Sequence, residues 1–333
     1  MTEKKRLQYV DIGKGLGMMM IVWMHIWGNN FYNFTPPILL NGNIGKIYVP
    51  LFFVLSGYLI KINTESVKMD IFKKVKSILR PFAVMYVFSF IVSYVLSSLG
   101  IGAKHAFEWT NFFNPLYSRT FFNGPLWFLL ALFWAFLLFY ALVKLCKGKE
   151  LYLFLATLML GCIGFYLDKI NITLPLFIGQ GFVGCPMLMI GYLIKKYIGQ
   201  HLTENRYWAI CIGIVGILLF VILSKGLSMQ SNSYEGFYPL SLLGITGGSL
   251  FFLSVSVLLE KYLPFVAYWG RYSLIVLCLH NFILIPITKI VAKFVHQSEI
   301  WAIATFIIVY LVFLVVVPMI AKFTPSLFNI KSK

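Results

Sequence analysis

Ten runs of apolar residues divide this 333-residue chain, and they constrain its fold more than any other feature of the sequence. Most are close to the roughly 20 residues that an α-helix needs to cross the hydrocarbon core of a bilayer. Backbone N–H and C=O groups in lipid must bond within their own segment, so runs of this length predict helices. We therefore expect an all-α polytopic membrane protein, a bundle of about ten transmembrane helices. The runs lie at 15–31, 46–61, 79–99, 125–145, 151–167, 174–194, 207–224, 239–259, 272–291 and 300–321.

The composition excludes several other classes of protein. Hydrophobic residues make up 60% of the chain and charged residues 12%, whereas a typical soluble domain has roughly 45–50% and 25%. These values exclude a soluble enzyme, a disordered chain, a collagen and a small secreted module held by disulfides. The five cysteines lie in or beside apolar runs without CxxC or CxxH spacing. We therefore expect neither a disulfide framework nor a metal site.

The distribution of basic residues predicts the orientation of the chain in the membrane. There are 28 Lys and Arg against 11 Asp and Glu, a net charge of +17. When the gaps between the runs are assigned to alternate sides, 21 of the 28 basic residues fall on the side that holds both termini. Cytoplasmic loops carry the excess of Lys and Arg, so we expect both termini in the cytoplasm. The basic residues alternate with apolar runs and form no single polar face, so no nucleic-acid partner is expected.

Two ionisable residues of the first predicted span are candidates for a functional site, because charge inside a membrane is costly and usually functional. Lys14 and His25 are 11 residues apart, so they share one helix face, with about 16 Å of rise between them. A neutral imidazole suits a general base at mid-bilayer, and the cation below it suits a phosphorylated donor. Asp11, one turn before Lys14, can pair with Lys14 or orient it. The alternative is that Lys14 extends to the interface and His25 bonds a neighbouring helix.

A second histidine lies in the ninth predicted span. His280 is nine residues past Arg271, about 13 Å above the cytoplasmic end of its helix, which is a depth similar to that of His25. Two histidines at like depth, one near each end of the chain, predict one shared cavity. Nine residues are two and a half turns, so Arg271 and His280 face opposite sides of their helix. The alternative is a histidine that only hydrogen-bonds within the bundle.

The loop at 61–80 is the most basic stretch of the chain. Its lysines, including Lys74 and Lys76, mark the cytoplasmic side and are expected to attract anionic lipid headgroups. Arg80 adjoins Pro81 at the mouth of the third predicted span. A guanidinium there can bind a phosphate through two hydrogen bonds, whereas a lysine acts as a point charge.

Two further segments contain small or aromatic residues. Ser56 and Gly57 form a small-residue pair in the second predicted span, which permits close approach of another helix. No G-x-S-x-G elbow or nearby acid supports Ser56 as a nucleophile. Trp127 lies at the outer end of the fourth predicted span, where aromatic residues gather at the membrane interface.

Together these segments resemble the acyltransferase-3 family of integral membrane O-acyltransferases. The resemblance covers essentially the whole chain, and the order and spacing of the segments make it specific. They are Lys14 and His25, FFVLSGY at 52–58, Arg80-Pro81, NGPLWFL at 123–129, and Gly270, Ser273, Leu274 and His280. The segment at 123–129 is similar to the fucose 4-O-acetylase-like branch. Two departures stand out: Lys14 replaces the commoner Arg, and the fourth-span motif PLWFLLALFW lacks the acidic residue of many relatives.

The resemblance implies an enzyme that moves an acyl group, most often acetyl, from cytoplasmic acyl-CoA to a hydroxyl group. The acceptor would be a glycan, a lipid-linked sugar or another cell-surface molecule, and the location a bacterial plasma membrane. Membrane lipids would surround the chain, and no permanently bound cofactor is expected. We expect residues 1–333 to form a single integral membrane domain without a fused extramembrane domain.

The resemblance also assigns roles to the residues singled out above. His25 would act as general base, beside Lys14 and Asp11, or would itself carry the acyl group. The expected acyl-CoA-binding residues are Lys14, Arg80, Lys74, Lys76 and Arg271. The expected acceptor-binding or oxyanion-stabilising residues are Ser56, Asn123, Trp127, His280 and Asn281.

Two other function classes stay open at this point. A transporter or flippase is supported by His25, His280 and the glycine-rich spans, although the sequence shows no internal repeat of the kind such proteins contain. A non-catalytic membrane partner of a glycan-assembly complex is the other. It predicts that His25→Ala leaves activity unchanged.

Overall fold

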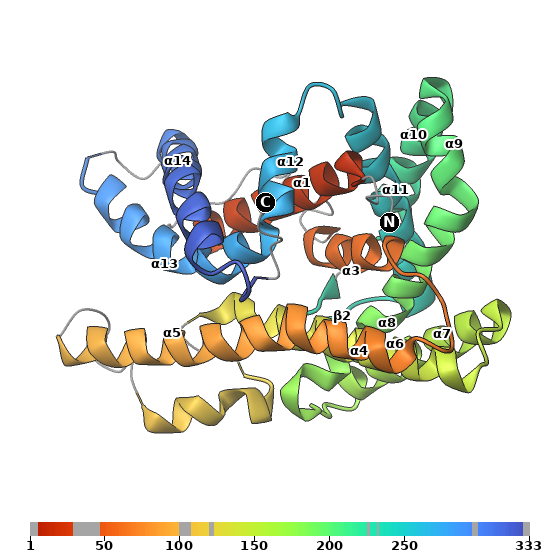
Figure 1. Cartoon of the computed structure of the whole chain (residues 1–333), viewed down its shortest axis with the longest axis horizontal. Helices are drawn as coiled ribbons and strands as arrows, with labels where there is room; N and C mark the ends of the chain where they lie inside the picture. Colours follow the sequence, from red (N-terminus) through yellow and green to blue (C-terminus); the bar gives the residue numbers. More distant parts are fainter. Residues whose placement is uncertain are drawn as a thin grey trace.

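The computed structural model describes residues 6–28, 47–99, 108–119, 123–224, 227–231, 233–294 and 299–328. Within these ranges the regular structure is helical apart from one antiparallel hairpin of two short strands, β1 (Leu227–Ser228) and β2 (Ser233–Tyr234). The predicted all-α class is therefore confirmed. The α-helices and two π-helical segments are α1 (Gln8–Gly28), α3 (Tyr48–Tyr58), α4 (Val67–Lys74), η2 (Val75–Leu79), α5 (Arg80–Ser98), α6 (Trp127–Leu145), α7 (Glu150–Lys169), α8 (Ile178–Leu193), η6 (Ile194–Ile198), α9 (Gly199–Glu204), α10 (Arg206–Leu223), α11 (Tyr238–Leu258), α12 (Pro264–Arg271), α13 (Ser273–Val291) and α14 (Glu299–Phe323) (Figure 1). Short 3₁₀ segments are η3 (Trp109–Tyr117), η4 (Gly124–Leu126) and η5 (Pro175–Phe177).

Eight of the described helical segments are long and apolar enough to cross a membrane, and they coincide with the third to tenth predicted spans. The chain is therefore a polytopic membrane protein. The first two predicted spans fall on α1 and α3. α3 has 11 residues, which give about 16 Å of helix, short of the roughly 30 Å hydrocarbon core. The last residues predicted for the first span, 29–31, and the first of the second, 46, lie outside the described residues.

α1 begins earlier than predicted, at Gln8, and has 21 residues. Asp11 lies in its first turn, where a carboxylate interacts favourably with the positive end of the helix dipole. The apolar run alone does not reveal this polar first turn.

The basic loop predicted at 61–80 is largely helical. α4, η2 and α5 follow one another without a break and form one long rod that runs along the long axis of the molecule (Figure 1). The π-helical turn lies just before Pro81, whose ring collides with the carbonyl four residues earlier and forces the helix to widen locally. The loop prediction is wrong over this stretch because Lys68, Lys73 and Lys76 lie on the solvent face of an amphipathic helix. Val67 and Ile78 are buried on its other face.

Glycines allow α3 and α8 to pack backbone against backbone. A Cβ on Gly57 would lie 2.0 Å from the carbonyl oxygen of Leu188, and one on Gly191 would lie 1.9 Å from that of Val54. Neither position has room for a side chain. The prediction that Ser56 and Gly57 permit close approach of another helix is confirmed.

α1 crosses α12 in the same manner. A Cβ on Gly270 would lie 1.6 Å from the carbonyl oxygen of Asp11. α1 itself is helical throughout its glycine-rich first half. The glycines of this helix therefore serve packing, and they give the transporter interpretation no broken helix here.

Candidate functional site

A cavity of about 200 Å³ lies between α1, α3, α6, α13 and the junction of α4 with η2. Its polar lining consists of Lys14, Ser56, Lys74, Ser77 and Ser273. The first three of these were predicted as site residues from the sequence. The apolar lining consists of Met18, Ile21, Phe52, Leu59, Ile78, Phe128, Leu129, Leu132, Phe136, Leu274 and Leu277.

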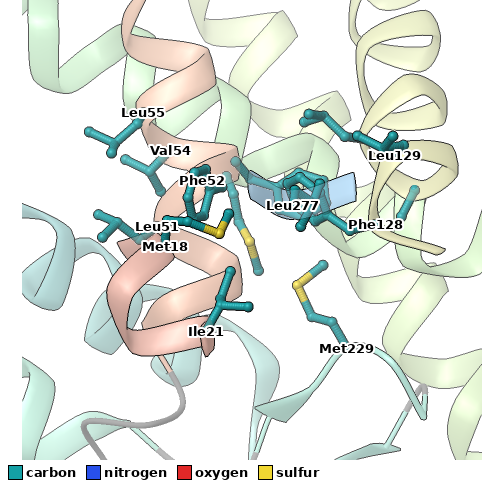
Figure 2. Close-up of a cluster of buried hydrophobic side chains, with 14 of the residues drawn as sticks. Met18, Ile21, Leu51, Phe52, Val54, Leu55, Phe128, Leu129, Met229 and Leu277 are labelled. Atoms are coloured by element: carbon teal, nitrogen blue, oxygen red, sulfur yellow. The ribbon is translucent and has the colours of Figure 1, made fainter. Parts of the chain in front are cut away.

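One face of α1 forms a wall of this cavity. Lys14, Met18 and Ile21 all line it, and their spacing of four and then three residues keeps them in one stripe. His25 continues the stripe one turn further. Figure 2 shows Met18, Ile21 and Phe52 in one cluster of buried apolar side chains, and these three residues also line the cavity. The shared helix face predicted for Lys14 and His25 is therefore a face that lines a cavity.

Lys14 and Lys74 bring two positive charges to the cavity. Among the residues that the structure describes, neither forms an ion pair with a carboxylate. The ammonium nitrogen of Lys74 lies 3.7 Å from the centre of the Phe136 ring, a cation–π contact that offsets part of the cost of desolvation. Two half-buried like charges without a counter-ion are unfavourable, so the arrangement fits an anionic ligand.

The structure brings His25 and His280 together. Their ring centres are 5.0 Å apart and their planes are inclined by 39°. His280 is fully buried and His25 is half-buried. These two residues are 255 positions apart in the sequence and were expected to share one cavity. Their rings are in contact, although neither lines the cavity described above.

The hydrogen bonds of His280 define its protonation pattern. Its Nδ1 lies 3.1 Å from the carbonyl oxygen of Val276 and 2.9 Å from that of Leu277. A carbonyl oxygen can only accept, so Nδ1 carries the hydrogen and donates it. In the neutral ring, Nε2 then holds a lone pair, and it is buried without a hydrogen-bond partner among the described residues. This tautomer has no N–H left for an oxyanion, so it does not suit the oxyanion role expected for His280.

The histidine pair lies just beyond the cavity. Neither His25 nor His280 is part of its lining. His25 follows Ile21 by four residues and His280 follows Leu277 by three, so each is about one helical turn past a lining residue. Apolar side chains thus separate the lysine end of the cavity from the histidines.

Asp11 and Arg271 belong to a second, separate cleft. The cleft has a volume of about 380 Å³, and its lining includes Arg6, Asp11, Tyr268 and Arg271. The Arg6 guanidinium donates two hydrogen bonds to the Asp11 carboxylate, one of them 2.9 Å long. Asp11 therefore pairs with Arg6 rather than with Lys14, because the guanidinium fork matches both carboxylate oxygens.

Two other residues expected to bind acyl-CoA lie away from the cavity. Arg80 and Lys76 are exposed and line neither of these hollows. The Lys76 ammonium instead lies 4.5 Å from the centre of the Phe72 ring. The helical continuation through η2 turns these side chains away from the face that carries Lys74.

Asn123 is buried and links two helices. Its Nδ2 donates to the hydroxyl of Ser89 on α5, at 3.2 Å, and to the carbonyl oxygen of Cys278 on α13, at 2.9 Å. Both N–H bonds of the amide are therefore used, which leaves no donor for an oxyanion. Its Oδ1, like that of Asn281, is buried without a partner among the described residues.

Trp127 was expected in the aromatic belt at the membrane interface, but it is buried in the bundle. Its ring packs 5.9 Å from that of Phe177 and 6.2 Å from that of Phe128. The expectation failed because η5 packs over the start of α6 and buries the Trp127 ring. The position of a residue along a predicted span does not reveal that another segment covers it.

Sequence reasoning missed Ser77 and Ser273 as residues that line the cavity, and Met229 as part of the apolar cluster beside it. Ser273 begins α13 and lines the cavity. It is part of the segment from Gly270 to Leu274 that carries the family resemblance, so the sequence could have identified it. Ser77 has no sequence signal, since its direction depends on the π-helical turn. Met229 lies in the turn between β1 and β2, is 3% exposed, and joins the apolar cluster near Ile21 (Figure 2).

A model of the acyltransferase domain family (acyltransferase-3) matches residues 7–323, nearly the whole chain. No curated protein and no solved structure matches.

Proposed function

Because the chain belongs to the acyltransferase-3 family, we propose that this membrane acyltransferase moves an acetyl group from acetyl-CoA to a hydroxyl of a surface glycan or lipid-linked sugar. Membership of this family identifies the chain as an acyltransferase and names neither its donor nor its acceptor. The donor, the acceptor, the fucose 4-O-acetylase-like specificity and the role of His25 are parts of this proposal.

The observation that carries the proposal is the pair of lysines in the cavity. Lys14 and Lys74 have no carboxylate partner among the described residues, and CoA offers phosphates that would neutralise them. Ser273 adds a hydroxyl at the first residue of α13. A helix N-terminus also attracts phosphate through its unpaired N–H groups.

The apolar part of the cavity suits the rest of the donor. Above the lysines its walls are formed by side chains such as Met18, Phe52, Phe128 and Leu277. These would surround the pantetheine arm and direct the thioester towards His25. Met18 and Ile21 must shift for the thioester to pass the last turn, and an unbranched methionine adapts easily to such a change.

The reaction then needs one base and no metal. His25 takes the proton of the acceptor hydroxyl as its oxygen attacks the thioester carbonyl. The tetrahedral intermediate collapses with cleavage of the C–S bond, and the protonated His25 returns the proton to the leaving CoA thiolate. The Ser56 hydroxyl lies at the lysine end of the cavity, since a Cβ on Gly13 would lie 3.2 Å from the side chain of Leu55, the residue before Ser56. There it would contact the donor phosphates rather than the oxyanion beside His25. Attack by His25 itself, with an acyl-histidine intermediate, is the variant of this scheme in which the acyl group is carried by the enzyme.

The test measures release of CoA by purified protein in nanodiscs, with acetyl-CoA as donor and with or without extracted envelope glycans. We expect glycan-dependent release by the wild type and none above background by His25→Ala. His201→Ala is the matched control, because His201 is an exposed histidine on α9. Acceptor-dependent release that survives in His25→Ala would contradict the assignment of the base. No release with acceptor-containing extracts, together with no binding of acetyl-CoA, would overturn the enzyme proposal.

A further inference from the structure

We propose that His280 is the positioning residue for His25, so that the two histidines act as a dyad in which the Nε2 of His280 accepts an N–H of His25. This inference rests on the proposed function, in which His25 is the base. It makes His280 a hydrogen-bond acceptor for His25. The sequence had suggested a different role, in which His280 binds the hydroxyl substrate or stabilises the oxyanion.

The first argument is the tautomer of His280. Donation from Nδ1 to the carbonyl oxygens of Val276 and Leu277 holds the ring in place and leaves a lone pair on Nε2. The nitrogen is fully buried and has no partner among the described residues. A buried acceptor of this kind costs free energy unless a donor reaches it.

The second argument is the distance to His25. The ring centres are 5.0 Å apart and the planes are tilted by 39°, a separation at which the edges of two imidazole rings can share an N–H···N hydrogen bond. Hydrogen bonds between catalytic groups are often loose before substrate binds and shorten in the complex. A small rotation of the half-buried His25 ring would close this bond.

The third argument is the absence of any carboxylate at this depth. An imidazole base works best when an acceptor on its other nitrogen fixes its tautomer and stabilises the imidazolium, as the aspartate does in a Ser-His-Asp triad. The sequences of α3, α5, α6 and α13 contain no Asp or Glu, and the one acid of α1, Asp11, is 14 residues before His25, about 21 Å along the helix. α14 also packs against this region, through Phe306 on Trp23, and its one acid is Glu299 at its first residue, seven residues or about 10 Å before Phe306. Among the described side chains of these elements, His280 is the one in contact with His25 that can fill this role.

The proton balance of the dyad is complete without another group. Neutral His25 donates one N–H to His280 and presents the lone pair of its other nitrogen to the acceptor hydroxyl. When it takes the hydroxyl proton, the resulting imidazolium keeps its bond to His280, which stays neutral. The same proton then passes to the CoA thiolate, and both histidines return to their starting state.

The test compares His280→Leu with His280→Gln, which replaces the ring by a side chain that carries an oxygen acceptor. We expect His280→Leu to lower kcat about 100-fold or more, by analogy with loss of the orienting group in a triad, with KM for acetyl-CoA within about two-fold of wild type. The kcat of His280→Gln should be at least about ten-fold higher than that of His280→Leu. A purely structural role for His280 would give equal losses in both variants, and that result would overturn the dyad.

A second measurement does not depend on turnover. In protein labelled with ¹⁵N-histidine, we expect His280, assigned by its absence in His280→Gln, to show the tautomer protonated at Nδ1. The His25 signals should change in the His280→Leu variant. Protonation of His280 at Nε2 alone would contradict the inference. Full activity of His280→Leu beside inactive His25→Ala would overturn the dyad and leave the proposed function standing, whereas a wild type without acetyl-CoA turnover would overturn the proposed function itself.

Discussion

Two polar clusters that contain lysine differ in one respect that separates a binding site from a structural contact. Lys196 on η6 lies 2.5 Å from the carboxylate of Glu150 on α7, and Tyr192 and Tyr197 donate to the same carboxylate. Lys14 and Lys74 line a cavity together and have no such partner among the described residues. The first cluster is complete as it stands. The second lacks an anion, and for this reason we assign the donor phosphates to it.

The largest expected effect is that of His25, about one helical turn beyond the Lys14–Lys74 cavity. His25→Ala should lower kcat by about 100- to 10,000-fold, because it removes the general base. The same variant should still bind acetyl-CoA, since the phosphate-binding lysines are untouched. Turnover and equilibrium binding, measured on one preparation, check both statements. Loss of binding together with turnover would mean that His25 supports the cavity rather than the chemistry.

The next effect concerns the unpaired lysines themselves. Replacing either one, as Lys14→Ala or Lys74→Ala, should raise KM for acetyl-CoA about 10- to 100-fold, because a charged hydrogen bond contributes about 1.5–3 kcal/mol. Lys14→Arg keeps the charge and should stay close to wild type. Steady-state kinetics at varied acetyl-CoA concentration give the comparison. An unchanged KM in both alanine variants would refute a phosphate site at this cavity.

Salt should distinguish the cavity from the membrane surface. Contacts between phosphates and lysines weaken as ionic strength rises, so KM for acetyl-CoA should increase with salt in the wild type. The increase should be smaller in the Lys14→Ala, Lys74→Ala double variant, because fewer charges remain to be screened. Identical salt dependence in the two proteins would locate the screened charges elsewhere.

The smallest effect is expected at the paired cluster. Lys196→Ala should leave KM and kcat for acetyl-CoA at the wild-type values and lower the thermal stability only slightly, since exposed ion pairs contribute little. Thermal unfolding in detergent and steady-state kinetics check this. A change in KM as large as that in Lys14→Ala would remove the distinction between the two clusters.

The sequence predicts the fold class well because apolar runs long enough to cross a membrane admit few alternatives to helices. It also predicts which residues of α1 share a face, since Lys14, Ile21 and His25 follow helical periodicity. Similar depth, which follows from residue number along a helix, predicted that His25 and His280 share a cavity. The structure places their rings 5.0 Å apart, but neither residue lines the cavity that holds Lys14.

The direction of a side chain around its helix is harder to predict where the helix is irregular or its start is uncertain. Arg80 and Lys76 were expected at the donor site, but the π-helical turn before Pro81 places Lys74 in the cavity and leaves both of them exposed. Arg271 lines a different cleft because α12 ends there and α13 begins in a new direction. Local charge density therefore selected Lys74, Lys76 and Arg80 alike, whereas the structure places only Lys74 of the three in the cavity lining.

Hydrogen bonds also revise roles that residue type alone suggests. Asn123 and His280 both have N–H groups that could stabilise an oxyanion, yet the structure commits those groups to Ser89 and to carbonyl oxygens of α13. The partners of Asn123 are 34 and 155 residues away in the sequence, so its hydrogen bonds could not be predicted without the packed bundle. The partners of His280 are the carbonyl oxygens three and four residues before it in α13, and the sequence does not reveal which ring nitrogen faces them.

The most direct test of the account is equilibrium binding of acetyl-CoA to the purified protein in nanodiscs. Wild type, His25→Ala and the Lys14→Ala, Lys74→Ala double variant would be titrated side by side at low salt. We expect the first two to bind with similar Kd and the double variant to bind at least about 10-fold more weakly. Equal affinity in all three proteins would contradict the assignment of the cavity as the donor site.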